Sequence, residues 1–462
     1  MKSFDLVVLG AGPGGYVAAI RAAQLGLNVA CVDENQQLGG TCLRVGCIPS
    51  KALLQSSHLY HEAKENLEDH GIGIKKLELD LNRMLSRKDE IVKTLTGGIK
   101  MLFQRSKVTP VIGRGKISGP GRVTVQLKSG EIEELSAPKI LIATGSVPLI
   151  LPGIDFDGDL IGDSTTALSY EDVPESLIVI GGGYIGLELG SVWSRLGATV
   201  TVLEGADRVL PGLDNEIGKI ARRIFEKQEL TFETEAWVES ATVENGQCVV
   251  KCKDREPLTA ARVLVCTGRV ANTKEIGLET IEISADKRGQ IVVDENFETA
   301  AKGVYAIGDC IGGAMLAHKA SDEGVACVEK FVNGFGSIHY DTIPAIVYTT
   351  PEIASVGKTE EQLKDAGVEY RKGICPFGAN GRARAMGDFD GRIKILAHAE
   401  TDRILGVHAI GPQAGDLIAE AAVAMQFGAS SEDLARCCHA HPTLSEVMHE
   451  AALAVSGRAI HT

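Results

Sequence analysis

The feature that most restricts the fold of this chain is a strand, a glycine-rich turn and a helix, which occur twice. The first copy opens with an apolar strand and closes on an acid. Its parts are the strand Asp5 to Leu9, the glycines Gly10, Gly12 and Gly15, an alanine-rich helix to Gly26, and a strand Asn28 to Val32 followed by Asp33.

The second copy lies near the middle of the chain. Its parts are the strand Leu177 to Ile180, the glycines Gly181, Gly183 and Gly186, a helix to Gly197, and a strand Thr199 to Leu203 followed by Glu204. From first glycine to terminal acid both copies span 23 residues (33 minus 10, and 204 minus 181). We therefore treat them as repeats of one structural unit.

Each residue type in this pattern has a physical task. The first glycine makes a tight turn, the second lets the backbone approach a pyrophosphate, and the third lets helix and strand pack closely. The acid accepts a hydrogen bond from a ribose hydroxyl, and the phosphates lie at a helix N-terminus. One such motif could be a turn without a ligand, but two full copies predict two dinucleotide sites. Carboxylates at Asp33 and Glu204 favour a free ribose hydroxyl, and so NAD rather than NADP.

A cysteine pair follows the first copy, in the run GGTCLRVGCIPSK at residues 39–51. Five positions along a regular helix rise about 7.5 Å, whereas a disulfide joins Cα atoms roughly 4.4 to 6.8 Å apart. A disulfide between Cys42 and Cys47 therefore needs a local distortion, which Gly46 can supply. Two buried thiols, or half of a metal site completed by His439 and His441, are the alternatives. The spacing is not that of a zinc site, and Lys51 would favour a thiolate, so we expect a redox pair and no metal.

A second group of chemical interest lies near the C-terminus. His441 can take up and return a thiol proton near neutral pH, and Glu446 can orient its imidazole. Pro442 keeps His441 out of the following helix. We expect His439, two residues earlier, to be structural, and the adjacent Cys437 and Cys438 to be packing thiols.

Four segments together resemble the dihydrolipoamide dehydrogenases, of the flavin-dependent pyridine nucleotide-disulfide oxidoreductase family. They are the run at residues 39–51, the doubled glycine motif, Ala306 to Asp309, and the run His439 to Glu446. The similarity extends over essentially the whole chain. It implies an α/β fold with two Rossmann-like dinucleotide-binding domains, for FAD and NAD, and a C-terminal α+β interface domain that forms a homodimer.

The resemblance also implies which residues bind the cofactors. For FAD they are Gly10, Gly12, Gly15, Asp33, Glu34, Gly40, Thr41, Cys42, Lys51, Gly115, Thr144, Gly145, Ser146, Asp309, Met315, Leu316, Ala317 and His318. For NAD they are Gly181, Gly183, Tyr184, Ile185, Gly186, Glu188, Glu204, Val238 and Gly268.

The catalytic roles are implied in the same way. Cys42 is the outer cysteine that meets the substrate, and Cys47 is the inner one that meets the flavin. His441, with Glu446, comes from the partner subunit as the base. Lys51 and Glu188 lie as a pair beside the reactive edge of the flavin. The implied reaction oxidises protein-bound dihydrolipoyl groups and reduces NAD, in 2-oxo acid dehydrogenase or glycine cleavage complexes, with free dihydrolipoamide as a small substrate.

Two residues depart from the family pattern. Arg44 replaces an asparagine between the cysteines, and Thr350 replaces a histidine before Pro351. Glutathione and mercuric reductases share the architecture, but Glu204 and the absence of a terminal cysteine pair disfavour them. A catalytically silent flavoprotein binding module is disfavoured because both cysteines, His441 and Glu446 are present.

Composition limits the partners. The net charge of −14 would repel nucleic acid and anionic membranes, and no apolar run reaches the roughly 20 residues that span a bilayer. Eleven cysteines in a chain of this length are too few for a secreted disulfide scaffold, and their number is odd. We expect a cytoplasmic protein, although a matured organellar form would have the same composition.

Linker residues predict the domain boundaries. Pro148, Pro152, Gly153 and Pro174 separate the two repeats, and a second break falls at 269–273. We expect an FAD-binding domain with the redox disulfide at 1–146, an NAD-binding domain at 147–271, a return segment of the FAD and central domain at 272–341, and the interface domain at 342–462.

Overall fold

A computed structural model describes all 462 residues and divides them into two compact units. Unit 1 comprises Met1–Ala52, Asn82–Leu149 and Gly268–Ile338, and unit 2 comprises Leu53–Leu81, Ile150–Thr267 and His339–Thr462. This division is coarser than the four segments expected from the sequence, which stay a prediction.

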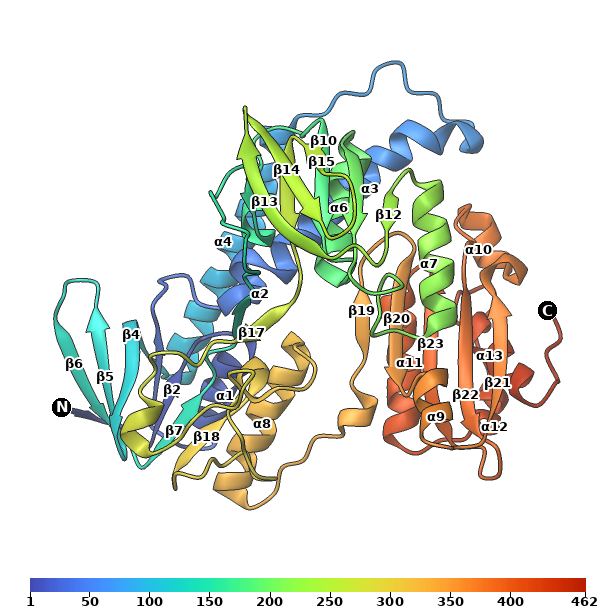
Figure 1. The fold of residues 1–462 in the computed structure, drawn as a ribbon. Coiled ribbons are helices and arrows are strands. Elements are labelled where there is room, and N and C mark those ends of the chain that lie inside the picture. The colour runs from blue at the N-terminus through green and yellow to red at the C-terminus, as the bar shows by residue number, and fades with distance from the viewer. The chain divides into compact units, whose positions relative to one another are not determined.

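An eight-stranded sheet forms the centre of unit 1, in the order β1-β6-β5-β4-β3-β2-β7-β18 (Figure 1). Strands β4, β3, β2, β7 and β18 pair in parallel, while β4, β5 and β6 form an antiparallel meander. Their bounds are β1 Lys2–Ser3, β2 Leu6–Leu9, β3 Val29–Asp33, β4 Thr109–Gly119, β5 Arg122–Leu127, β6 Ile132–Ser136, β7 Lys139–Ile142 and β18 Val304–Ala306.

Two helices pack against each other beside this sheet because small residues let them approach. They are α1 (Pro13–Gln24) and α8 (Ala317–Asn333). A Cβ added at Gly14 would lie 3.0 Å from the carbonyl oxygen of Ala320, and one at Gly324 would lie 2.7 Å from that of Gly14. The first predicted repeat is confirmed as β2, α1 and β3.

The other elements of unit 1 are short strands and helices from three stretches of the chain. They are α2 (Gly40–Val45), the start of α3 (Cys47–Glu65), α4 (Leu81–Ser106), β8 (Ser146–Pro148), β17 (Arg269–Ala271), η2 (Leu278–Ile281) and η3 (Gly308–Ile311). β17 pairs with β8, so the chain that returns at 268 lies along the segment that leaves at 149.

Unit 2 contains a parallel sheet built on the second repeat, in the order β12-β11-β10-β16-β9. β10 (Ser176–Ile180), α6 (Tyr184–Leu196) and β11 (Thr199–Leu203) confirm that repeat. The rest of this part comprises β9 (Ile161–Gly162), α5 (Ser164–Ala167), α7 (Asn215–Lys227), β12 (Thr231–Glu233), β16 (Arg262–Val265) and the antiparallel meander β13 (Val238–Glu244), β14 (Gln247–Cys252) and β15 (Leu258–Ala260).

The C-terminal part of unit 2 is an antiparallel sheet in the order β19-β20-β23-β22-β21. Its strands are β19 (Ala345–Val347), β20 (Glu352–Gly357), β21 (Tyr370–Pro376), β22 (Arg392–His398) and β23 (Ile404–Gly411). The helices α9 (Glu360–Asp365), α10 (Gly381–Met386), α11 (Ala414–Gln426), α12 (Ser431–Arg436) and α13 (Glu446–Val455) accompany them, with η1 (Leu67–His70), η4 (Tyr340–Thr342) and η5 (Phe377–Ala379) completing the unit.

The expected strand at Arg392 and the helices near Asp416 and Ser431 are confirmed as β22, α11 and α12. The alternating pattern of β22 would suggest one solvated face, but every interior position of the strand is buried. Lys394 on that strand is completely buried because polar side chains of α7 and α9 cover it.

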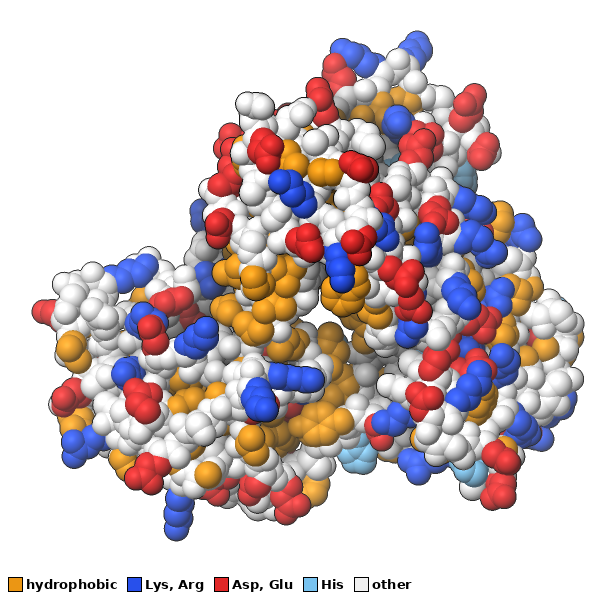
Figure 2. Space-filling view, in the orientation of Figure 1, with side chains coloured by type: hydrophobic (Ala, Val, Ile, Leu, Met, Phe, Trp, Pro, Cys, Tyr) orange, Lys and Arg blue, Asp and Glu red, His pale blue; other side chains and the backbone are white.

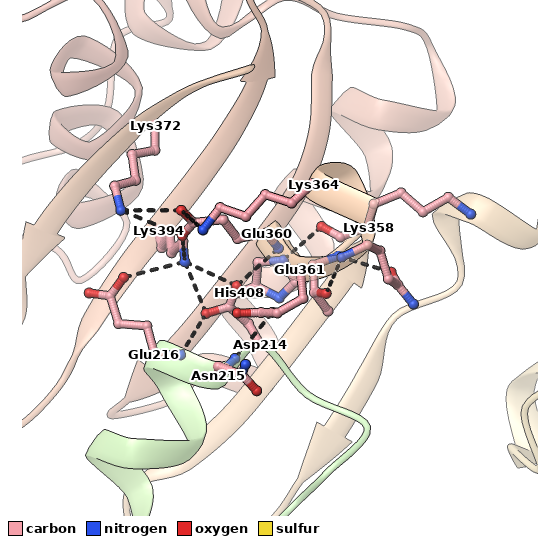
Figure 3. Close-up of polar contacts among 12 residues, drawn as sticks. Asp214, Asn215, Glu216, Lys358, Glu360, Glu361, Lys364, Lys372, Lys394 and His408 are labelled. Atoms are coloured by element: carbon pink, nitrogen blue, oxygen red, sulfur yellow. Dashed lines mark hydrogen bonds and ion pairs between the residues drawn. The ribbon is translucent and has the colours of Figure 1, made fainter. Parts of the chain in front are cut away.

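Lys394 belongs to a cluster of charged side chains (Figure 3). The ammonium of Lys394 lies 3.0 Å from Asp214, 3.3 Å from Glu216 and 2.5 Å from Glu360. Asp214 also caps α7 by accepting from the N–H of Glu216 at 3.1 Å. The cluster therefore ties the start of α7 to the C-terminal sheet.

Acidic and basic side chains are intermingled over the face of the molecule drawn in Figure 2. No helix of the chain is long and apolar enough to cross a membrane.

Candidate active site and dinucleotide cradles

The first glycine turn, in unit 1, has no room for side chains. A Cβ at Gly10 would lie 2.3 Å from the carbonyl oxygen of Ala143, and one at Gly15 would lie 1.8 Å from that of Gly10. Gly12 is the N-cap of α1 and has no side-chain cap. No side-chain oxygen of the N-cap residue accepts from the N–H groups at this helix end, which leaves them available to an anion.

The second glycine turn, in unit 2, repeats this geometry. A Cβ at Gly181 would lie 2.4 Å from the carbonyl oxygen of Cys266, and one at Gly186 would lie 2.2 Å from that of Gly181. Gly183 is the uncapped N-cap of α6. The two turns are alike in backbone contacts as well as in spacing.

The acids at the ends of the two repeats make matching hydrogen bonds. Asp33 accepts from the N–H of Ala11 at 2.8 Å, and Glu204 accepts from the N–H of Gly182 at 2.7 Å. The second oxygen of Glu204 accepts from the N–H of Ala206 at 2.8 Å. Each carboxylate is thus held at its glycine turn, where a ribose hydroxyl would meet it.

A threonine occupies a matching position at each glycine turn. The sequence predicted a binding role for Thr144 but not for Thr267. Thr144 and Thr267 each follow the residue whose carbonyl crowds the first glycine of a repeat. Both hydroxyl oxygens are buried and have no hydrogen-bond partner within the chain. Buried hydroxyls without partners are costly, so each of these two atoms fits a polar ligand. We call each glycine turn, together with its acid and this threonine, a cradle. The first cradle contains Gly10, Asp33 and Thr144, and the second contains Gly181, Glu204 and Thr267.

A polar network at the first cradle includes a residue that sequence reasoning missed. Ser146 donates to Asp309 at 2.5 Å, and Arg269 donates to the hydroxyl and the carbonyl of Ser146 at 2.7 and 2.6 Å. Asn272 adds a backbone bond to the carbonyl of Gly145 at 2.9 Å. The sequence indicates only that Arg269 lies in a linker. No local pattern pairs it with Ser146, because the two are joined by the β8–β17 contact.

The remaining residues expected to bind FAD lie in unit 1. Gly40 adopts a φ of +62°, and a Cβ there would lie 2.5 Å from the Cα of Gly12. A Cβ at Gly115 would lie 2.9 Å from Leu9. Met315, Leu316 and Ala317 are half-buried at the start of α8, whereas Glu34, Thr41 and His318 are exposed.

The remaining residues expected to bind NAD are placed less uniformly. Tyr184 and Val238 are half-buried and Ile185 is exposed, all in unit 2. Gly268 belongs to unit 1, although its neighbour Thr267 belongs to unit 2. It has a φ of +123°, which favours glycine.

The two expected redox cysteines lie side by side. The distortion predicted at Gly46 is confirmed: α2 ends at Val45, α3 begins at Cys47, and a Cβ at Gly46 would lie 2.9 Å from the carbonyl oxygen of Thr41. Both cysteines are thiols here, hydrogen-bonded to each other. The pKa of Cys42 is raised by that hydrogen bond and by burial, while the charge of Lys51 acts to lower it.

The expected partner of Lys51 is in the other unit. Glu188, in α6, is buried and accepts from the backbone N–H of Tyr348 at 3.0 Å. The pairing of Lys51 with Glu188 stays a prediction.

The histidine and carboxylate expected near the C-terminus are in contact. His441 Nδ1 lies 2.8 Å from Glu446 Oε1, and the N–H of Thr443 donates to the other oxygen at 2.9 Å. Burial acts to raise the pKa of Glu446, but these two hydrogen bonds outweigh it and the pKa is lowered. The His441 side chain is 79% exposed, so Nε2 is free to face a substrate.

His439, by contrast, has hydrogen-bond partners within the protein for both of its ring nitrogens. His439 Nε2 lies 2.6 Å from Glu420, and Nδ1 lies 3.0 Å from the carbonyl oxygen of Cys437. Its ring stacks on His449 with centroids 5.0 Å apart. Cys437 and Cys438 are exposed, which contradicts their expected role as packing thiols.

Comparison with known proteins agrees with this geometry. Residues 4–324 match the pyridine nucleotide-disulphide oxidoreductase family, and residues 343–452 match the dimerisation domain of the same family. The chain belongs to the pyridine nucleotide-disulphide oxidoreductases. Membership explains the doubled cradle, and the dimerisation domain supports a homodimer.

Several members of this family are similar to the chain over its full length. The mitochondrial dihydrolipoyl dehydrogenase of Pisum sativum is 50% identical, over 99% of this chain and 92% of that protein. The human mitochondrial enzyme is 49% identical with the same coverage. Among solved structures, LpdA from Mycobacterium tuberculosis superposes with a TM-score of 0.91 at 29% identity, over 98% of this chain and 99% of that one.

The comparisons bear on cofactors and location. FAD and NAD are the cofactors of this family, and the two cradles fit one dinucleotide each. The expectation of a cytoplasmic protein is wrong, because similar proteins from plants and mammals are named as mitochondrial. Composition could not make this distinction, since both compartments keep thiols reduced.

Proposed function

We propose that this chain is a dihydrolipoyl dehydrogenase, which oxidises dihydrolipoyl groups to lipoyl and reduces NAD. The observation that carries the proposal is the hydrogen-bonded pair Cys42 and Cys47, directly after the first of two matching cradles. A thiol pair in a chain with two dinucleotide sites suits electron transfer from a dithiol to a nicotinamide. Full-length similarity to proteins of that name supports it.

In the proposed reaction the enzyme begins with a Cys42–Cys47 disulfide. A dihydrolipoyl thiol gives its proton to His441, and the thiolate attacks the sulfur of Cys42. A mixed disulfide forms, and Cys47 leaves as a thiolate. The second lipoyl sulfur then displaces Cys42, which takes that sulfur's proton, and lipoyl is released. Two electrons now reside on the cysteine pair.

His441 and Glu446 are suited to the proton transfer. With Nδ1–H donating to Glu446, Nε2 carries the free lone pair and acts as the base. The carboxylate then stabilises the imidazolium that forms. The N–H of Thr443 holds the other oxygen of Glu446, so the carboxylate is fixed beside His441.

FAD, when bound, would accept the electron pair from the cysteines and deliver it to NAD as hydride. The first cradle, with Asp33, Thr144 and Asp309, would hold FAD, and the second, with Glu204 and Thr267, would hold NAD. Lys51 would stabilise negative charge at the flavin, with Glu188 as its proposed partner.

We further propose that the substrate is a lipoyl domain of a 2-oxo acid dehydrogenase or glycine cleavage complex. In the homodimer, each site would combine the cysteines of one chain with His441 of the other. The exposed ring of His441 is consistent with a group that functions in an assembly.

A steady-state assay tests the activity. The purified holoenzyme should reduce NAD with free dihydrolipoamide, and should not reduce oxidised glutathione with NADPH. Cys42→Ser and Cys47→Ser should each abolish turnover. A chain that binds FAD and NAD but does not oxidise dihydrolipoamide would contradict the proposal.

A further inference from the structure

One large aromatic side chain at the second cradle is not buried. The chain has two tryptophans, of which Trp193 is fully buried and Trp237 is 65% exposed. Trp237 immediately precedes β13, and its carbonyl accepts from the N–H of Lys253 at 2.8 Å. Its backbone is therefore fixed while its indole ring faces solvent. Burial of apolar surface does not explain a tryptophan in this position.

The segment that carries Trp237 runs along the residues that follow the ribose-binding acid. The N–H of Ala236 donates to the carbonyl of Glu204 at 2.9 Å, and that of Glu235 donates to the carbonyl of Ala206 at 2.8 Å. A Cβ built on Gly205 would lie 3.4 Å from two carbons of the indole ring. The ring thus lies against the backbone directly after Glu204.

The cradle determines the direction in which a dinucleotide would extend. Its pyrophosphate lies at the glycine turn and the adenosine ribose at Glu204. The adenine must then continue past the ribose, toward the residues that follow the acid. Gly205 offers no side chain there, whereas the exposed indole offers a flat apolar face. Purine rings stack on tryptophan because both are large planar π-systems.

We propose that Trp237 forms a wall of the adenine subsite and stacks on the base of NAD. This proposal rests on the function proposed above, because it requires that the second cradle bind NAD. Trp237 is then a specificity residue for the adenosine half of the coenzyme. It takes no part in hydride transfer.

Kinetics with two coenzymes test the proposal. Trp237→Ala should raise the KM for NAD roughly fivefold to 100-fold, as loss of one base-stacking contact does. It should leave kcat and the KM for dihydrolipoamide unchanged. With nicotinamide mononucleotide, which has no adenine, the variant should match the parent protein. Trp237→Phe should recover most of the NAD affinity, and Val243→Ala, an exposed apolar residue of the same β13 strand, should have no effect.

A binding experiment gives a second readout. NAD added to the holoenzyme should quench tryptophan emission, and this change should disappear in Trp237→Phe, because the remaining Trp193 is buried. An equal rise in KM for both coenzymes, or quenching that survives in Trp237→Phe, would overturn the proposal. If the parent protein does not bind NAD at all, the proposed function fails instead.

Discussion

Lys394 and Asp214 form a buried ion pair, with the ammonium 3.0 Å from both carboxylate oxygens, across 180 positions of sequence. Neither side chain is exposed to solvent. Asp214 begins α7, which belongs to the dinucleotide-binding part of unit 2, and Lys394 lies on β22 of the C-terminal sheet. The pair therefore joins the start of α7 to the C-terminal sheet, two elements that lie far apart in the sequence.

Lys394→Met should lower the free energy of unfolding by about 3–5 kcal/mol, because it leaves buried carboxylates without their cation. Chemical denaturation of the holoenzyme measures this. Lys372→Met is the matched control: Lys372 also contacts Glu360, at 3.4 Å, but its side chain is 45% exposed. We expect at most about 1 kcal/mol from the control. Equal losses in the two variants would show that the buried pair has no special role.

Asp388 should make stability depend on pH. Burial, with the charges of Glu62 and Asp390, raises the pKa of this carboxyl from 3.8 to about 6. A raised pKa means that the folded state disfavours the charged form of this carboxyl. Asp388 therefore destabilises the folded protein fully above about pH 6. This destabilisation is lost as the pH falls to the pKa of the unfolded state, 3.8. Asp388→Asn should therefore stabilise the protein by about 1–3 kcal/mol at pH 7.5. The gain should vanish near pH 4 in denaturation curves, and Asp365→Asn, at an exposed site, should show none.

Glu204 should set the preference for NAD. Its charge would face the 2′-phosphate of NADP, so Glu204→Gln, which keeps an acceptor for the N–H of Gly182, should reduce discrimination against NADP roughly tenfold or more. The ratio of kcat/KM for the two coenzymes measures this. Asp207→Asn removes an exposed charge three residues later and should leave the ratio near its original value. Efficient use of NADPH by the unchanged protein would contradict this interpretation of Glu204.

His441→Gln should lower kcat/KM for dihydrolipoamide by about 10²–10⁴-fold, because the general base is lost. Oxidation of NADH by an artificial electron acceptor should persist, since it needs no thiol deprotonation. His439→Gln should reduce thermal stability but change kcat little, because both of its ring nitrogens are bonded within the protein. If His439→Gln were the more damaging change to catalysis, the roles of the two histidines would be reversed.

A mixed dimer tests whether sites are shared. One chain would carry Cys47→Ser and the other His441→Gln. With shared sites, one site receives both changes and the other receives neither, so activity returns to about half that of the unchanged dimer. An inactive heterodimer of verified composition would mean that each chain supplies its own base.

The sequence alone determined the two cradles and the reactive groups. Asp33 accepts from the N–H of Ala11 within the first repeat, and Cys42 contacts Cys47 five positions later, so spacing and residue type predict both contacts. His441 and Glu446 are five positions apart, and their hydrogen bond was predictable for the same reason. Family resemblance extended this to the whole chain.

Only the tertiary structure decided the contacts between segments that are distant in sequence. Lys394 has the pattern of a solvated strand residue, and its burial depends on α7 and α9. Arg269 meets Ser146 because β17 pairs with β8, and Trp237 meets Gly205 because two loops run side by side. Hydrophobic periodicity predicts which face of an element is apolar, but it carries no information about which distant polar group will lie opposite, because that depends on how the elements pack.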